Sequence, residues 1–261
     1  MAFYKALENI ELKKYSEVNP ETFAVIFYSK TSFKSNSLFD KDMKQKVSTY
    51  FEDEKRSSML LSKELTGDAR DILVIKDFDA KKPKHKKYTW MNNIFLGLEK
   101  YGVVNASIYA DTSNLIKDKN FVFDLAKIAE KATYRYTDTN PNTKAEATLK
   151  TLDICVDKSN ASLKKLVEHG FNLGRGANTA RNLGNRPANH ATPTYIANHI
   201  NDLAKEIGGF TVEILEERDM KKLGMGSLLS VSEGSVEPAK LVTMQYKGGK
   251  KDAKPIVLVG K

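Results

Sequence analysis

The sequence predicts an α/β protein, because runs typical of buried strands alternate with runs typical of amphipathic helices along most of its length. The strand candidates are rich in β-branched and aromatic residues, whereas the helix candidates space their apolar residues by three and four. We expect an amino-terminal α/β domain with a largely parallel or mixed sheet, then a long connecting helix, then the start of a second α/β domain. The expected boundaries are residues 1–158, 159–187 and 188–261.

The first domain is predicted to contain four strands and three helices. The strands are TFAVIFYS, DILVIKDF, VVNASIYA and TLKTLDICV, at residues 22–29, 71–78, 103–110 and 148–156. The helices cover residues 37–51, 88–102 and 121–136. Between the last helix and the last strand, the polar segment TDTNPNTKAE is rich in turn residues and is predicted to be a surface loop.

The second half opens with a long helical pattern at residues 159–187, which we interpret as a spacer between domains. It ends at Arg186, because Pro187 disfavours a helical conformation in the residue before it. Glycines on this helix predict close packing against another segment. They are Gly170, Gly174 and Gly176. A new helix then has clear start signals, with Thr192 as the N-cap and Pro193 at the first helical position.

After this helix the sequence predicts short elements. Strands are expected at residues 210–215, 240–248 and 254–260, a short helix at 217–224, and a strand or turn at 226–234. The run from Ile256 to Val259 has no polar alternation, which is typical of a strand buried on both faces of a parallel sheet. We therefore expect the last strand to be deeply buried.

Length and composition are those of a globular protein, with 261 residues, 41% hydrophobic and 29% charged. No apolar stretch approaches the roughly 20 residues that a membrane helix needs. Charged residues near the start leave no apolar centre for a secretory signal. The single cysteine, Cys155, is predicted to be a core residue of a strand rather than a nucleophile, and it fits a reducing compartment. We expect a cytoplasmic protein with no membrane partner.

The formal net charge of +9 raises the question of a nucleic-acid partner. Positive charge is spread over both halves, and one run, DAKKPKHKKYTW, is dense in lysine. Its lysines are Lys81, Lys82, Lys84, Lys86 and Lys87. Two interpretations stay open: a solvated loop leading into a helix, or a phosphate-binding surface.

Four motifs follow one another in a fixed order in the second half. They are NTARNLGNRPANHATPTYIANHI at 178–200, LGMG at 223–226, GSVEPAKL at 234–241 and VGK at 259–261. In this order and with these gaps they resemble the cytosolic leucyl aminopeptidase family of dinuclear metallopeptidases. The resemblance is strong from about residue 165 to the last residue, and before that it extends only to the order of elements.

The resemblance implies that the last part of the chain begins an α/β aminopeptidase catalytic domain. It also implies a homo-hexamer that removes amino-terminal residues from peptides, using a water activated by two divalent metal ions, manganese or zinc. Lys261 matches the first metal ligand of the family, and its amine must lose its proton to bind a metal. The family's other ligands and catalytic groups have no counterpart here, so we expect no catalytic residue in this chain and no activity from it alone.

Other residues are assigned structural roles, and other functions remain as alternatives. The histidines lack metal-ligand spacing; they are His85, His169, His190 and His199. Glu216 and Glu217 are interpreted as a solvated helix start rather than an acid and base pair. The alternative function is DNA binding through the lysine run, which the resemblance also suggests, or a role of the first domain in assembly.

Overall fold

The computed structural model divides the chain into two compact units, one from Tyr4 to Arg181 and the other from Asn182 onward. The structure describes residues 6–29, 33, 39–66, 70–79, 81–118, 120–139, 147–250 and 252–260. Within this part of the chain, no helix is both long enough and apolar enough to cross a membrane.

The first unit is built on a six-stranded sheet in the order β1-β6-β5-β2-β4-β3. The strands are β1 Asn9–Lys14, β2 Phe23–Tyr28, β3 Ser58–Leu61, β4 Ile72–Lys76, β5 Asn105–Tyr109 and β6 Thr151–Val156. All neighbours are parallel except β3, which pairs antiparallel with β4. The predicted mixed α/β sheet is therefore confirmed, and its four predicted strands are present.

Two strands were not predicted, and both lie at the edges of the sheet. Strand β1, NIELKK, alternates charged and apolar residues, and only its apolar positions Ile10 and Leu12 are buried. Strand β3 has four residues. Edge strands are commonly short or charged, so they lack the continuous apolar run that identifies a central strand.

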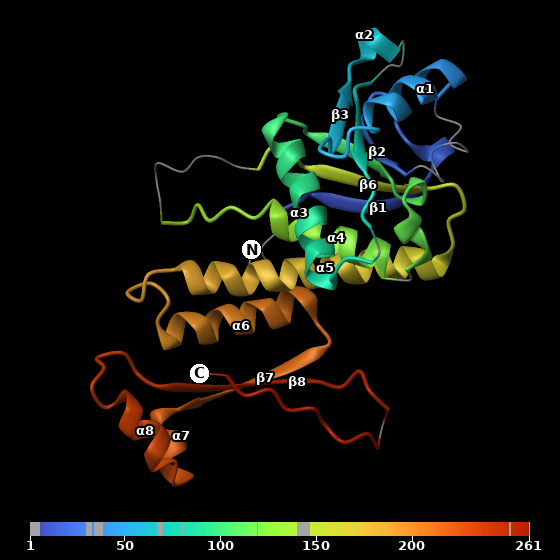
Figure 1. Cartoon of the computed structure of the whole chain (residues 1–261). Coiled ribbons are helices and arrows are strands. Elements are labelled where there is room, and N and C mark those ends of the chain that lie inside the picture. The colour runs from blue at the N-terminus through green and yellow to red at the C-terminus, as the bar shows by residue number, and fades with distance from the viewer. Residues whose placement is uncertain are drawn as a thin grey trace. The chain divides into compact units, whose positions relative to one another are not determined.

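Helices cover both faces of this sheet (Figure 1). They are α1 Lys41–Tyr50, α2 Lys63–Thr66, α3 Lys84–Lys100, α4 Phe121–Ala132 and α5 Ala161–Asn185, with short 3-10 turns at Tyr15–Glu17, Ala110–Thr112 and Asn114–Lys117. The pleat of β2 sends Val25 and Phe27 into the core beneath α3 and α4, and Ala24, Ile26 and Tyr28 into the core on the other face, beside α1. The predicted loop covers residues 137–146, and residues 140–146 of it lie outside the described residues.

Helix α5 packs closely against α4, as the glycines of its sequence predicted. A Cβ atom added at Gly170 would overlap the backbone carbonyl of Phe123, and one at Gly174 would lie 2.9 Å from the carbonyl oxygen of Lys127. Gly176 has open space instead. Most of α5 is therefore a layer of the first unit rather than a bare spacer.

The second unit contains three helices and a two-stranded antiparallel sheet among its described residues. They are α6 Pro193–Ile207, β7 Phe210–Glu216, α7 Glu217–Lys222, α8 Gly226–Ser232 and β8 Lys240–Tyr246. The predicted start of α6 is confirmed, because the Thr192 side chain accepts a hydrogen bond from the backbone N–H of Tyr195. Gly208, at a φ of 71°, ends this helix.

Two predictions for the second unit are wrong. The segment GSLLSVS forms helix α8 instead of a strand or turn. Within it, the hydroxyls of Ser230 and Ser232 donate to carbonyls three residues earlier. The run Ile256–Val259 forms no strand and is exposed; Leu258, for example, is 92% exposed. A strand needs a hydrogen-bonding neighbour, and in the described part of the unit β7 and β8 pair only with each other.

Candidate functional site

The residues that carry the family motifs lie in the second unit and on the end of α5. The first motif spans the end of α5, the corner before α6 and the first half of α6. The LGMG motif joins α7 to α8, and its Gly224 has a φ of 72°, a conformation that favours glycine. The motif beginning at Gly234 leads into β8, and the Glu217 carboxylate fixes it by accepting a hydrogen bond from the N–H of Ala239. The second and third motifs thus form the turn between α7 and α8 and the approach to β8.

Lys261, the one residue predicted to bind a metal, lies outside the described residues. Among the residues that the structure describes, no group of three or more histidine, cysteine, aspartate or glutamate side chains is arranged to hold a metal ion. The described side chains of these four types therefore would not hold the implied metal ions by themselves.

Residues that the sequence assigned to structure occupy structural positions. Cys155 is fully buried in β6, and burial raises the pKa of its thiol to about 12, so it stays protonated at neutral pH. Glu216 forms an ion pair with Lys240 across the β7–β8 pair. His199 lies on α6 beside Tyr195, and its pKa is lowered, first by burial and then by the charge of Arg186.

The lysine run divides into two classes in the structure. Four of its lysines are exposed on the loop before α3 and on its first turn: Lys81, Lys82, Lys84 and Lys86. Lys87 is different, because its side chain is only 8% exposed and its Nζ lies 2.9 Å from Asp118 and 3.1 Å from Asp124. Lys87 therefore fits neither of the two interpretations left open by the sequence, a solvated loop or a phosphate-binding surface, because two carboxylates neutralise its charge.

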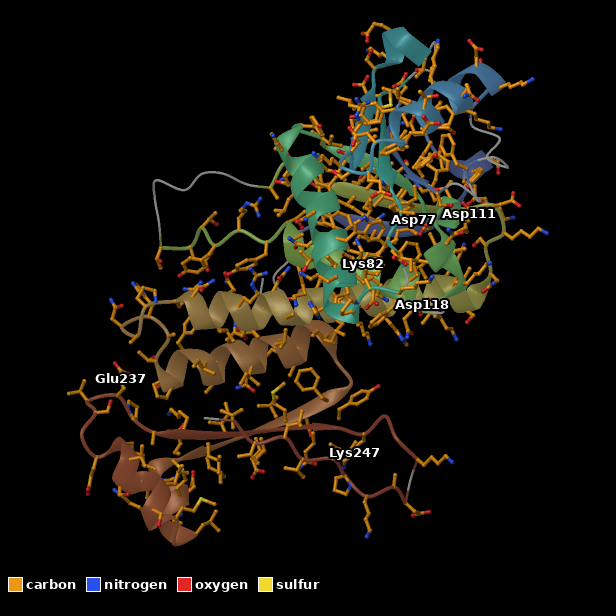
Figure 2. The ribbon with its side chains drawn as sticks, viewed as in Figure 1. Asp77, Lys82, Asp111, Asp118, Glu237 and Lys247 are labelled. Atoms are coloured by element: carbon orange, nitrogen blue, oxygen red, sulfur yellow. The ribbon has the colours of Figure 1, made fainter. Side chains whose placement is uncertain are left out.

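A pocket of about 560 Å³ opens where this loop meets the start of α4. Its charged lining comes from α3, from α4 and from the segments before these two helices. The charged residues are Lys82, Lys84, Lys87, Asp118, Asp124 and Lys127. Figure 2 labels two of these residues, Lys82 on the loop after β4 and Asp118 on the segment before α4. The pocket thus lies beyond the carboxyl ends of β4 and β5, the position where α/β sheets commonly place ligands.

A network of ion pairs forms the floor of this pocket. Asp124, with a side chain 3% exposed, binds Lys127 at 2.7 Å as well as Lys87. Burial alone would lower the pKa of Lys87, but its hydrogen bonds and charge interactions with Asp118 and Asp124 outweigh burial and raise it. The hydrogen bond from Lys87 in turn lowers the pKa of Asp118. Lys87 and Asp118 therefore remain charged and paired at neutral pH.

The sequence alone did not reveal this pocket. Asp118, Asp124 and Lys127 lie more than thirty residues from most of the lysine run, and they join it only because α3 and α4 pack side by side. One local signal was available: Asp124 and Lys127 are three residues apart on a helix and therefore share a face.

Comparison with known proteins shows which family the motif-bearing region resembles. Residues 178–261 match the model of the cytosol aminopeptidase family, catalytic domain. This region is therefore similar to the catalytic domain of the cytosol aminopeptidase family. A protein of Nitrosococcus oceani named "Probable cytosol aminopeptidase" is 44% identical over 142 residues, which cover 52% of this chain and 28% of that protein. The resemblance inferred from the four motifs is therefore confirmed.

Two solved structures share this fold. A mutant of the tomato leucine aminopeptidase superposes with a TM-score of 0.68 at 16% identity, covering 94% of this chain and 52% of that chain. The bottromycin maturation enzyme BotP, in complex with Mn, gives a TM-score of 0.62 at 18% identity, covering 87% of this chain and 45% of that chain. The chain thus spans about half the length of these structures, and its match covers less of the curated relative.

Proposed function

We propose that the chain is part of a leucyl aminopeptidase, a metal-dependent hydrolase that removes amino-terminal residues from peptides. The observation that carries this proposal is the match of residues 178–261 to the family's catalytic domain, with four motifs in order. By function the chain divides into an α/β domain at 1–158, a connecting helix at 159–187 and the beginning of the catalytic domain at 188–261.

The proposal includes two divalent metal ions, manganese or zinc, with Lys261 as one ligand. Two such ions would polarise the peptide carbonyl and lower the pKa of a bound water. The manganese bound by the related enzyme BotP supports a divalent metal in this family's fold. The family resemblance assigns no further ligand to this chain, so the 261-residue chain alone is proposed to be inactive.

The proposed enzyme is a cytoplasmic homo-hexamer. The name of the curated relative, a cytosol aminopeptidase, supports the cytoplasm, while the hexamer rests on the family resemblance alone. An assembly role of the first domain would accompany this function. The proposal does not include DNA binding. Lys87 is buried in ion pairs, and the name of the curated relative describes an aminopeptidase.

Hydrolysis of a leucyl amide substrate tests the proposal. We expect the protein as its cells make it to hydrolyse the substrate with Mn²⁺ or Zn²⁺, and to lose activity when a chelator removes the metal. Lys261→Ala should abolish activity because it removes a metal ligand, whereas the control Lys254→Ala, at an exposed position, should retain it. Metal-independent activity, or an active Lys261→Ala protein, would contradict the proposal. Hydrolysis by residues 1–261 alone would contradict the expected inactivity of this chain.

A further inference from the structure

The pocket between the starts of α3 and α4 is large enough to hold a small molecule. Its volume of about 560 Å³ lies within the range of roughly 300 to 1,000 Å³ that is usual for ligand sites. It is formed entirely within the first unit, by residues that follow β4 and β5. Its ligand is therefore a question independent of the proposed peptidase activity.

Positive charge exceeds negative charge in this pocket. Four lysines and two aspartates line it. Both carboxylates are already paired, Asp124 with two lysines and Asp118 with one. Lys82 and Lys84 are exposed, and within the described residues neither forms an ion pair within 4.0 Å, although the charge of Lys84 also helps to lower the pKa of Asp118. Two ammonium groups are thus left for an anion that enters the pocket.

Aromatic rings form the apolar part of the lining. They belong to Phe78, Tyr88 and Phe123. All three are only partly buried, so each presents some ring surface to the pocket. Lys127 Nζ lies 5.0 Å from the ring centroid of Tyr88 and 4.9 Å from that of Phe123, which holds this cation against the aromatic wall. Rings beside cations are suited to a ligand that combines a flat ring with a negative charge.

We propose that this pocket binds a small organic anion, a phosphate or carboxylate attached to a planar ring, with Lys82 and Lys84 contacting the anion and Tyr88 contacting the ring. A nucleoside diphosphate is the simplest member of this class that can be used as a probe. The pocket favours a small ligand over a nucleic acid duplex, because the other exposed lysines of the run, Lys81 and Lys86, do not line it.

Titration calorimetry of the full chain with ADP at low salt tests the proposal. We expect ADP to bind with a dissociation constant at or below about 1 mM. The double variant Lys82→Ala/Lys84→Ala should weaken binding about fivefold or more, because it removes both exposed cations of the mouth. The matched control Lys81→Ala/Lys86→Ala removes the same charge from the same run outside the pocket and should change binding less than twofold. All four lysines are exposed, so both variants should fold.

Two further titrations test the two parts of the ligand. Tyr88→Leu should weaken ADP binding but leave pyrophosphate binding unchanged, because only ADP carries a ring. Benzoate replacing ADP distinguishes a carboxylate from a phosphate as the favoured anion. Failure of both ADP and benzoate to bind at millimolar concentration would overturn the proposal. Equal losses in the two double variants would also overturn it, since they would show diffuse attraction to the whole lysine run, including attraction of duplex DNA.

Discussion

The two compact units differ in how much apolar surface they bury. In the first unit, strands and helices enclose two continuous cores, one on each face of the sheet. In the described part of the second unit, the only buried apolar residues are Ala197 and Met220. Many of its apolar side chains are exposed instead, such as Val236, which is 100% exposed, and Leu258.

This difference shows that a region can resemble a known family in sequence without burying its own apolar side chains. The family's catalytic-domain model matches the region that buries little of its own apolar surface. The first unit, where the four motifs are absent apart from the end of α5, has the complete core. Packing within the second unit therefore does not account for most of its apolar residues, whereas in the first unit packing explains nearly all of them.

The largest expected effect comes from the same substitution made in each unit. Leu125→Ala, at a position 0% exposed in α4, should lower the free energy of unfolding by about 2 to 5 kcal/mol, because it leaves a cavity in the core. Leu258→Ala should change it by less than about 0.5 kcal/mol. Urea unfolding followed by circular dichroism reports on both units, and the fluorescence of Trp90, the single tryptophan, whose ring centroid lies 5.3 Å from that of Phe27, reports on the first unit. Similar decreases in the free energy of unfolding in both variants would contradict the inferred difference in apolar burial between the units.

A second pair of substitutions tests the packing of α5 on α4. Gly170→Ala should destabilise the first unit by about 1 to 3 kcal/mol, because the new methyl group overlaps the backbone of Phe123 and the helices must separate. Gly176→Ala on the same helix meets open space and should stabilise it by up to about 1 kcal/mol. Thermal unfolding followed by circular dichroism measures both. Stabilisation by both alanines would show that α5 is only loosely held against α4, contrary to the close packing that its glycines predicted.

The sequence predicted what depends on local pattern. The central strands β2, β4, β5 and β6 were identified because burial on both faces demands continuous apolar residues. The start of α6 was identified because capping chemistry is local. The edge strands and the exposure of Ile256–Val259 were not, because they depend on which segments become neighbours.

Tertiary contacts also decided what could be foreseen of the candidate site. Lys87 looked like its exposed neighbours, since nothing near it in sequence shows the two aspartates that bury and neutralise it. Lys261 was assigned by resemblance to a family, and this assignment remains a prediction. The pocket became visible only when the sheet order had placed α3 beside α4.

The smallest expected effect concerns Glu130, a carboxyl that joins three segments of the first unit. Its side chain accepts hydrogen bonds from the N–H groups of Ala6, at 2.8 Å, and Leu7, at 2.9 Å, and from the Asn178 amide on α5, at 3.2 Å. Among the described residues of the second unit, no charged side chain is buried. A substitution at Glu130 therefore tests a buried carboxyl, a feature that distinguishes the first unit from the described part of the second.

Burial raises the pKa of Glu130 above its ordinary value of 4.5, and the three hydrogen bonds and the charge of Arg175 only partly oppose this. The folded state then holds the proton more tightly than the unfolded chain, so the contribution of Glu130 to stability is complete below pH 4.5 and falls as pH rises through the raised pKa. Glu130→Gln should cost about 1.5 kcal/mol, because its amide faces a backbone donor. The cost should be largest at low pH and shrink as pH increases. Urea unfolding from pH 4 to 8 measures it, with the exposed Glu168→Gln as control. A cost that grew with pH would mean that the carboxylate is the form the fold stabilises.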